Sequence, residues 1–288
     1  MNLRLRFSII IPTYHRNDLL ASCLDCLAPG VQTLPPEQYE VIVTDDGFQS
    51  TAEEIIRERY PWVNWVAGPR RGPAANRNNG AKHARGEWLA FTDDDCLPDP
   101  QWLEAYAAAT VAQIDYLVFE GQTYVDRPRC SLAETSPINQ SGGYLWSCNF
   151  MMQRNQFESL AGFDERFPYA AMEDVDLGLR LTKRGHQCFF VQAASVCHPW
   201  RAKGGWEKIK QHQESTFIYL ALHPEELSRL TSTYYIRLTL RYLLQEIIPG
   251  LIQFKAAGIK VALMELMATL QMAYFMWVRS HATNSCLN

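Results

Sequence analysis

The 288-residue chain lacks the glycine-rich loops that hold nucleotide phosphates in two large classes of α/β protein. No G-x-G-x-x-G follows the first β-branched run, Phe7–Ile11, and no G-x-x-x-x-G-K-[ST] occurs anywhere in the sequence. The first absence disfavours a dinucleotide-binding Rossmann site, and the second disfavours a P-loop nucleoside triphosphatase. If this chain binds a nucleotide, carboxylates and a metal ion must hold it.

A basic excess and a disulfide framework are also missing. The formal net charge is −4, so the overall charge does not indicate nucleic-acid binding. The eight cysteines are unevenly spaced, which favours reduced intracellular thiols in a chain of this length. Cys23 and Cys26 form a C-x-x-C, but no second pair lies nearby at zinc-site spacing. We therefore interpret these two residues as packed thiols.

Long hydrophobic runs are scarce. The N-terminal apolar stretch is too short for the hydrophobic region of a signal peptide and is interpreted as a strand, which predicts a cytoplasmic protein. One long apolar stretch, Val261–Val278, is interrupted by Glu265, Thr269 and Gln271. A carboxylate within a membrane span costs about 2.5–3.5 kcal/mol. This cost disfavours a transmembrane helix and leaves a buried, a dimerising or a membrane-surface helix.

The sequence does contain a series of apolar strands that each end in polar residues. Predicted helices separate these strands, and this alternation indicates right-handed crossovers and an open, mostly parallel Rossmann-like α/β sheet flanked by helices. Ligands of such sheets bind at the carboxyl edge of the strands. The polar residues expected at this edge are Thr13, Tyr14, Asp45, Asp46 and Asp93–Asp95.

Three consecutive carboxylates, Asp93, Asp94 and Asp95, follow the buried strand predicted at Trp88–Phe91. Adjacent carboxylates repel one another, and a strand end tolerates them when a cation or hydrogen-bond donors neutralise their charge. Taken alone, the run is equally compatible with a solvated acidic turn. The rest of the sequence has to decide between a metal site and such a turn.

Further polar residues accompany the triple aspartate. Arg77 lies in a loop that leads into a helix, where its guanidinium can face a phosphate or a base, or can form a surface salt bridge. Glu173, Asp174 and Asp176 occupy the first turn of a predicted helix, where acidic residues also complement the helix dipole. His198 follows a strand and can ligate a metal, although such a histidine is also typical of a hydrogen-bonded loop.

Six features in this order resemble glycosyltransferase family two, whose catalytic domain has the GT-A fold. They are SIIIPTYHR, VIVTDDG, GPAANRNNGAKHARGEWLAFTDDD, NFMMQRNQFESLAGFDERF, EDVDLGLRL and His198. The resemblance covers about residues 7–199. It implies an inverting, metal-dependent glycosyltransferase that moves a sugar from a nucleoside-diphosphate sugar, with UDP as the favoured nucleotide, to a hydroxyl of a glycan or lipid-linked acceptor in polysaccharide or glycoconjugate synthesis.

The resemblance also implies how the metal is bound. Asp93–Asp95 corresponds to the DxD motif, with Asp95 as the main contact to Mn²⁺ or Mg²⁺. Asp93 and His198 are further candidates for the metal site. Asp93 and Asp94 are candidates for contacts to the ribose or to groups around the metal. An all-oxygen site completed by substrate phosphates suits either cation.

A second set of implied residues binds the nucleotide. By the resemblance, Pro12, Thr13, Tyr14, Asp46 and Arg77 cradle the base and ribose, and the Asp46 carboxylate accepts from a base N–H. Uracil fits this acceptor, and guanine and thymine also can. The family pattern usually has Asn where this chain has a histidine at position 15, and Ser where it has a phenylalanine at position 48. Base identity therefore stays open.

The resemblance assigns the proton chemistry to the second acidic cluster. Asp174 matches the ED motif and is expected to be the general base, which contributes about 10²- to 10⁴-fold to the rate. Glu173 is expected to orient the acceptor or the donor sugar. A single in-line displacement of this kind inverts the anomeric centre. The triple aspartate thus holds the donor, while Asp174 carries the proton.

The predicted domain organisation combines this resemblance with a change in the character of the sequence after Pro199. Residues 1–199 form the GT-A catalytic domain, with a nucleotide-sugar half at about 1–100 and an acceptor half at about 101–199. The polar segment Asp126–Gly143 is predicted to be a mobile loop that grips the second substrate. Residues 200–288 form a helical extension. These helices either pack on the catalytic domain, form a homodimer, or rest on a membrane as a peripheral contact near a lipid-linked acceptor.

Two other functions remain compatible with the residues. The first is a non-catalytic sugar-nucleotide or glycan-binding protein that retains the fold, against which the intact acidic motifs argue. The second is a nucleotidyltransferase on a similar sheet. Such an enzyme is expected to carry a glycine-rich basic loop after its first strand, where this chain has TYHRND.

Overall fold

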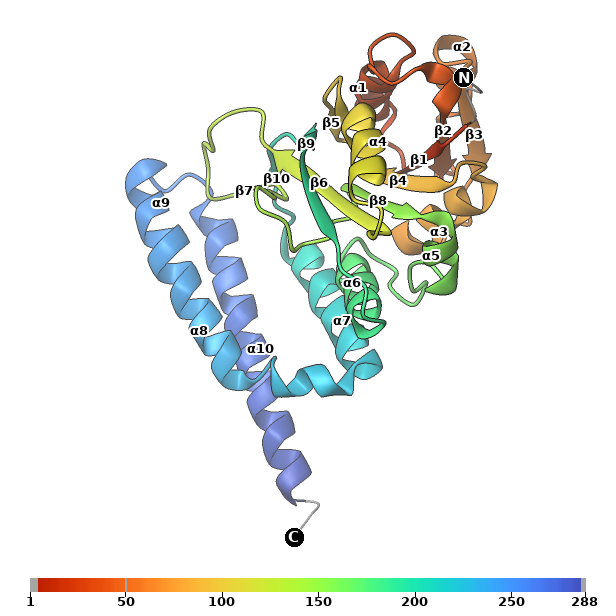
Figure 1. Cartoon of the computed structure of the whole chain (residues 1–288). Coiled ribbons are helices and arrows are strands. Elements are labelled where there is room, and N and C mark those ends of the chain that lie inside the picture. The colour runs from red at the N-terminus through yellow and green to blue at the C-terminus, as the bar shows by residue number, and fades with distance from the viewer. Residues whose placement is uncertain (1–4, 50, 286–288) are drawn as a thin grey trace. The chain divides into compact units, whose positions relative to one another are not determined.

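The structure, a computed structural model, describes residues 5–49 and 51–285. The chain forms two compact units (Figure 1). The first comprises Met1–Asp126 and Pro137–Pro199, and the second comprises Arg127–Ser136 and Trp200–Asn288. Ten residues of the segment that the sequence places in a loop are thus part of the second unit. Each unit has its own packing and is described by itself.

An eight-stranded sheet forms the centre of the first unit, in the order β3-β2-β1-β4-β8-β6-β9-β5. Strands β8 and β5 run against the other strands of this sheet, which are mutually parallel. This confirms the predicted α/β fold class with a mostly parallel sheet. The strands are β1 (Phe7–Thr13), β2 (Tyr39–Asp45), β3 (Val63–Ala67), β4 (Trp88–Thr92), β5 (Leu97–Pro98), β6 (Val118–Tyr124), β8 (Asn149–Gln153) and β9 (Phe189–Cys197).

Helices cover both faces of this sheet, because its central strands are apolar at successive positions. Ile9 and Ile11 of β1 point into one core, and Ile10 points into the other. Burial on both faces is the usual state of parallel strands. The first core packs against α1 (Asn17–Leu27), α2 (Glu53–Arg59) and α4 (Trp102–Ala112), and the second against α3 (Pro73–His83), α5 (Arg154–Ser159) and α6 (Glu173–Lys183).

Strand β1 continues through Pro12, beyond the strand predicted at Phe7–Ile11. It pairs with β2 as far as Thr13, but with β4 only as far as Ile10. Pro12 therefore lies where β1 has a ladder neighbour on one side, and proline is tolerated there because its missing N–H removes no ladder hydrogen bond. The extra residues carry the end of β1 to the carboxyl edge of the sheet.

Two-residue strands and a register shift are features that the sequence does not show. Phe189–Cys197 form one strand, β9, whose pairing with β6 shifts register between Gly121 and Thr123. The segment predicted as a mobile loop contains β7 (Glu134–Thr135), which pairs with β10 (Arg201–Ala202) in the second unit. This pairing and a bridge between Thr123 and Asn139 hold the segment at two points.

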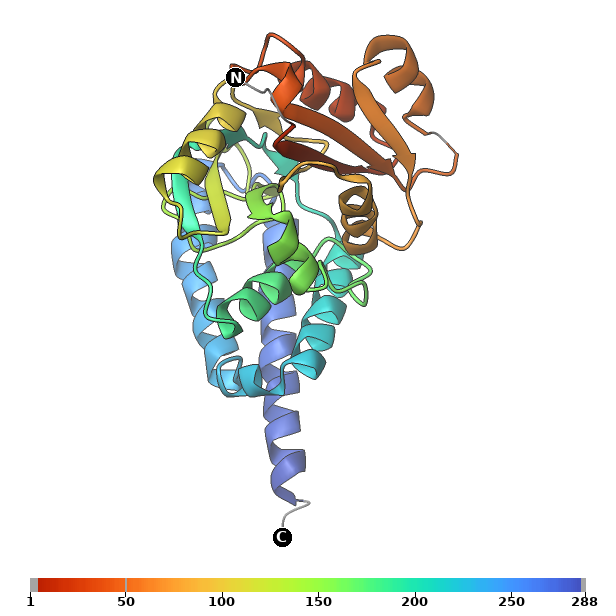
Figure 2. The same ribbon diagram turned by 45° about the vertical axis from the view of Figure 1, so that its right-hand side comes forward.

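The second unit is mainly helical, and α8 and α10 run side by side in opposite directions (Figures 1 and 2). Helix α7 also packs on α10. A small core contains Leu132, Ile247 and Ala262. The helices are α7 (Trp206–Leu222), a 3₁₀ turn (Pro224–Ser228), α8 (Ser232–Tyr242), a π-helical turn (Leu243–Ile247), α9 (Ile248–Gln253) and α10 (Ile259–Ser285).

Candidate active site

The ends of β1 and β4 bring Asp94 into contact with two donors. Its carboxylate is buried, accepts a hydrogen bond from the Thr13 hydroxyl at 2.8 Å, and lies 2.5 Å from a guanidinium nitrogen of Arg16. Burial raises the pKa of Asp94 to about 7, although the charge of Arg16 opposes this shift. Asp94 thus faces the protein interior and fixes the loop after β1 against the end of β4.

A buried arginine joins the two acidic clusters that the sequence singled out. Arg77 on α3 donates to Asp93 at 2.6 Å and to Glu173 at 3.1 Å. Its guanidinium also lies over the ring of Phe163, at 5.6 Å from the centroid. Only 3% of the Arg77 side chain is exposed, so its salt bridges are internal and not the surface kind considered from the sequence. Burial raises the pKa of Glu173 to about 7, with the nearby Asp174 adding to the effect.

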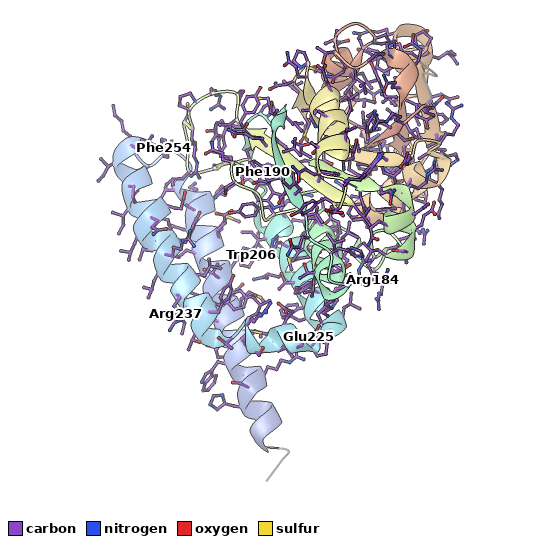
Figure 3. The ribbon with its side chains drawn as sticks, viewed as in Figure 1. Arg184, Phe190, Trp206, Glu225, Arg237 and Phe254 are labelled. Atoms are coloured by element: carbon purple, nitrogen blue, oxygen red, sulfur yellow. The ribbon has the colours of Figure 1, made fainter. Side chains whose placement is uncertain are left out.

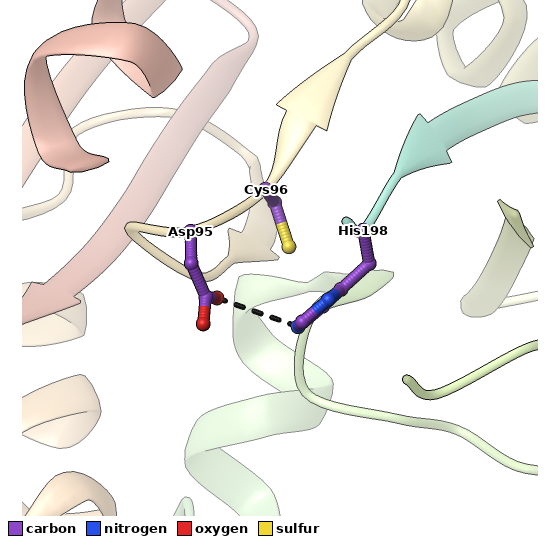
Figure 4. Close-up of side chains that lie close together, drawn as sticks. All are labelled: Asp95, Cys96 and His198. Carbon is purple, nitrogen blue, oxygen red and sulfur yellow. Dashed lines mark ion pairs between the residues drawn. The ribbon is translucent and has the colours of Figure 1, made fainter. Parts of the chain in front are cut away.

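Asp95 and His198 approach each other from the segments that follow β4 and β9 (Figure 4). Their nearest side-chain atoms, Oδ1 and Nε2, are 3.4 Å apart. The Cys96 thiol lies in the same group, in which the potential ligand atoms are within 4.8 Å of one another. Burial raises the pKa of Cys96 well above its usual value, so this thiol stays protonated and is a poor ligand for a hard cation. The oxygen and nitrogen donors of the other two residues fit Mn²⁺.

Asp174 lies in the first turn of α6, after Met172 in the left-handed conformation (φ 70°). Its Oδ1 accepts from the Val175 N–H at 2.8 Å, and the Ser147 N–H also donates to its carboxylate. Burial nevertheless raises its pKa above the ordinary value. The neighbouring Asp176 instead pairs with Arg180 of the same helix at 2.7 Å. Of the two aspartates, Asp174 is the one without a cationic partner of its own on α6.

The two aspartates at the end of β2 accept hydrogen bonds from different backbone loops. Asp45 accepts from the N–H groups of Gly47 at 2.8 Å and Ala52 at 2.6 Å. Asp46 accepts from Arg70 N–H at 2.8 Å and Gly72 N–H at 3.3 Å. Burial raises the pKa of Asp46, and these two backbone donors oppose the rise. Asp45 therefore shapes the loop after β2, and Asp46 fixes the entry to α3.

Aromatic side chains gather beside the carboxyl end of β1. Tyr14 is 52% exposed, and its ring lies 4.3 Å from His15 and 6.2 Å from Phe48, measured between centroids. His15 has a positive φ of 54°. The two positions at which the chain departs from the family pattern therefore contact each other through a ring pair at 5.0 Å. Pro12, by contrast, is buried within the strand.

Three residues of this region were not singled out from the sequence. Arg16 donates to Asp94 and Asp95, at 3.2 Å and 3.0 Å. Cys96 joins the Asp95–His198 group, and Ser147 donates to the carboxylate of Asp174. A signal for Arg16 exists, since it is the first basic residue after β1. Its partners lie about eighty residues later, and only the pairing of β1 with β4 brings them near.

Comparison with known proteins gives a family match for part of the chain. Residues 8–127, about two fifths of the chain, match the family described as Glycosyl transferase family 2. The match begins in β1 and includes the ends of β1, β2 and β4, so it contains the first acidic cluster. It ends before β8 and α6, where Asp174 lies.

Individual relatives agree with this match. Validoxylamine A glucosyltransferase of Streptomyces hygroscopicus subsp. limoneus is 30% identical over 219 residues, which are 62% of this chain and 48% of that protein. The chain thus spans about half the length of this relative. It also covers 60% of S. aureus TarS 1–349 solved in complex with UDP-GlcNAc, with a TM-score of 0.54, 21% identity and 69% of this chain aligned.

A second solved structure extends the likeness in fold. GalNAc-T7, solved with UDP, GalNAc and Mn²⁺, aligns with 75% of this chain and 48% of its own, with a TM-score of 0.56 and 16% identity. At these identities the likeness concerns the fold. Together with the strand order, it confirms the GT-A fold that the sequence predicted.

Proposed function

We propose that this chain is an inverting, divalent-metal-dependent glycosyltransferase that moves a sugar from a nucleoside-diphosphate sugar to an acceptor hydroxyl. The observation that carries the proposal is the pair of acidic clusters, at the end of β4 and the start of α6, which Arg77 joins through Asp93 and Glu173. One cluster can hold a charged donor while the other handles a proton. The fold has its ligand site at this carboxyl edge of the sheet.

The nucleotide is proposed to bind along the ends of β1 and β2. Pro12, Thr13, Tyr14 and Asp46 line this region, and Arg77 supports it from α3. The raised pKa of Asp46 reflects its burial, and a base N–H supplies a further donor to its carboxylate. A UDP-sugar is our preferred donor, because TarS was solved with UDP-GlcNAc and GalNAc-T7 with UDP.

Asp95 and His198 are the residues proposed to hold a divalent cation, Mn²⁺ or Mg²⁺. Their donor atoms face each other at 3.4 Å, and Asp93 lies two positions before Asp95 in the same acidic run. When bound, the cation neutralises the charge that develops on the leaving diphosphate. The Mn²⁺ in GalNAc-T7 supports this choice of ion. Arg16 and Thr13 keep Asp94 turned inward, which leaves Asp95 on the donor side.

Asp174 is proposed as the general base. It removes the proton of the acceptor hydroxyl while the hydroxyl oxygen attacks the anomeric carbon from the face opposite the diphosphate, so the configuration inverts. Burial raises the pKa of Asp174 above its ordinary value, which strengthens the ionised carboxylate as a base. Glu173 and Arg77 position the start of α6 at the reacting centre. The acceptor is a hydroxyl of a growing glycan or a lipid-linked sugar.

Replacing Asp174 with Asn tests this proposal. The asparagine side chain has the same size and keeps one acceptor oxygen, but it has no carboxylate that can take up a proton. We therefore expect kcat for sugar transfer to fall about 10²- to 10⁴-fold. Donor affinity, measured by calorimetry, should stay close to that of the wild type. Asp18→Asn is the matched control, because Asp18 is an exposed first-turn aspartate of α1. Full transfer activity in Asp174→Asn would remove Asp174 from the mechanism.

A further inference from the structure

Helix α10 uses two of its sides within the helical unit. Toward α8, the Thr239 hydroxyl donates to that of Thr269 at 2.9 Å. Toward α7, the rings of Phe217 and Phe275 lie 4.5 Å apart, and the Gln213 amide donates to a backbone carbonyl of α10 at 3.3 Å. These contacts leave a third side of α10 to be accounted for.

The third side of α10 is an exposed apolar stripe. Leu263, Met267, Leu270, Tyr274 and Trp277 recur at alternating spacings of four and three, which places them on one side of the helix. Each of these five side chains is at least 46% exposed. By length and composition, Ile259–His281 is also apolar enough to cross a membrane. The exposed stripe is therefore a large apolar surface that the helical unit itself does not cover.

Helix α8 extends this stripe into a face. Ile236 and Leu240 of α8 and Leu244 of the π-helical turn that follows it are exposed and recur at a spacing of four. In both helices, an exposed residue comes one position after a residue of the α8–α10 contact: Leu240 follows Thr239, and Leu270 follows Thr269. Because the helices are antiparallel, residues one position after the contact point to the same side of the pair. The two stripes thus form one continuous surface, called here the apolar face.

The charges around the apolar face are basic. The helical unit carries 12 Lys and Arg against 7 Asp and Glu, whereas the first unit carries 15 against 24. From α8 onward, the two acidic residues are Glu246, which pairs with Arg129 at 2.6 Å, and Glu265, which pairs with Lys203 at 2.6 Å. The basic residues of the same segment are exposed: Arg237 (Figure 3), Arg241, Lys255, Lys260 and Arg279.

We propose that the apolar face docks in the plane of an anionic lipid membrane. Apolar side chains on one side and exposed Lys and Arg beside them are the features of helices that lie in the headgroup region. Tyr274 and Trp277 are of the residue types that are enriched at the headgroup level of a membrane. A homodimer formed through this face would also cover the apolar residues. It would, however, bring Arg237 and Lys260 near the like charges of the second copy. A crossing helix would have to give up the Glu265–Lys203 pair.

Vesicle sedimentation of the full chain tests this docking. We expect binding to phosphatidylcholine vesicles that contain phosphatidylglycerol, at least about tenfold weaker binding to phosphatidylcholine alone, and a further loss at high salt. Met267→Glu with Tyr274→Glu should reduce binding at least about tenfold. The matched control is Val111→Glu with Ile114→Glu, two apolar residues that are 73% and 80% exposed in the first unit, and it should bind as the wild type does.

A second variant separates docking from misfolding. Arg237→Gln with Arg241→Gln leaves the apolar face intact. This variant should bind anionic vesicles more weakly than the wild type does, and its binding to neutral vesicles should be unchanged. Several results would overturn the proposal: no sedimentation with anionic vesicles, equal loss in the control variant, or resistance of the bound protein to alkaline extraction, which indicates a crossing helix. A dimer without vesicle binding, split by the Met267→Glu and Tyr274→Glu pair in light scattering, would assign the face to a second copy.

Discussion

At the scale of single residues, two arginines balance the acidic groups of the site. Arg77 lies between Asp93 and Glu173, and Arg16 reaches Asp94 from the loop after β1. Close carboxylates are tolerated where cations offset their repulsion. The sequence showed the carboxylates directly, because they are contiguous. It left the contacts of Arg77 and of Arg16 open, because both arginines reach acidic residues on elements that become neighbours only on folding.

The buried Asp94 makes stability depend on pH. Its pKa is raised to about 7 in the folded protein, whereas the unfolded chain releases this proton near pH 4. The folded state therefore binds the proton more tightly, and the resulting stabilisation is complete below about pH 4 and lost as pH rises through about 7. From pH 5 to pH 8, we expect the free energy of unfolding to drop more in the wild type than in Asp94→Asn, by on the order of 2 kcal/mol.

Urea unfolding at these two pH values, with a chelator present, measures this difference. The chelator matters because a cation bound at Asp95 would also favour the ionised form of Asp94. The same pH dependence in both proteins would mean that Asp94 is ionised in the folded state throughout this range.

At the scale of elements, a substitution at Gly72 tests how α3 is positioned. Its φ is 93°, and a Cβ atom there would lie 2.3 Å from the carbonyl oxygen of Pro168. Its N–H also donates to Asp46. We expect Gly72→Ala to lower the free energy of unfolding by about 2 kcal/mol or more, and to weaken nucleotide binding.

Gly30→Ala is the matched control for this substitution. Gly30 has a similar φ of 87°, but a Cβ there has no neighbour within 4 Å among the described residues. The control therefore carries the backbone cost alone, about 1 kcal/mol. Equal losses of stability in the two variants, measured by urea unfolding, would show that the approach to Pro168 is unimportant.

The elements also show what a sequence can and cannot predict. Helix α6 begins at Glu173 as expected, because an acidic first turn is a local signal. Strands β5 and β7 each have two residues, and their existence depends on a partner far away in the sequence. The continuity of β9 likewise comes from its pairing with β6.

At the scale of the whole molecule, the two units differ in charge and chemistry. The first has an excess of nine acidic residues and the second an excess of five basic residues. Composition changes near residue 200, which the sequence makes visible. That residues 127–136 join the helical unit depends on the β7–β10 pair, which composition does not show. We propose that the acidic first unit transfers the sugar and that the basic second unit docks on a membrane.

The most direct test of the proposed site is calorimetric titration of UDP into the full chain, with Mn²⁺ and with a chelator. We expect UDP to bind in the presence of Mn²⁺ and at least about tenfold more weakly without it, and we expect Asp95→Ala to remove this dependence. Asp115→Ala, at an exposed aspartate after α4, should bind UDP as the wild type does. Unchanged UDP affinity in Asp95→Ala with Mn²⁺, or equal affinity with and without the metal, would contradict the proposed site.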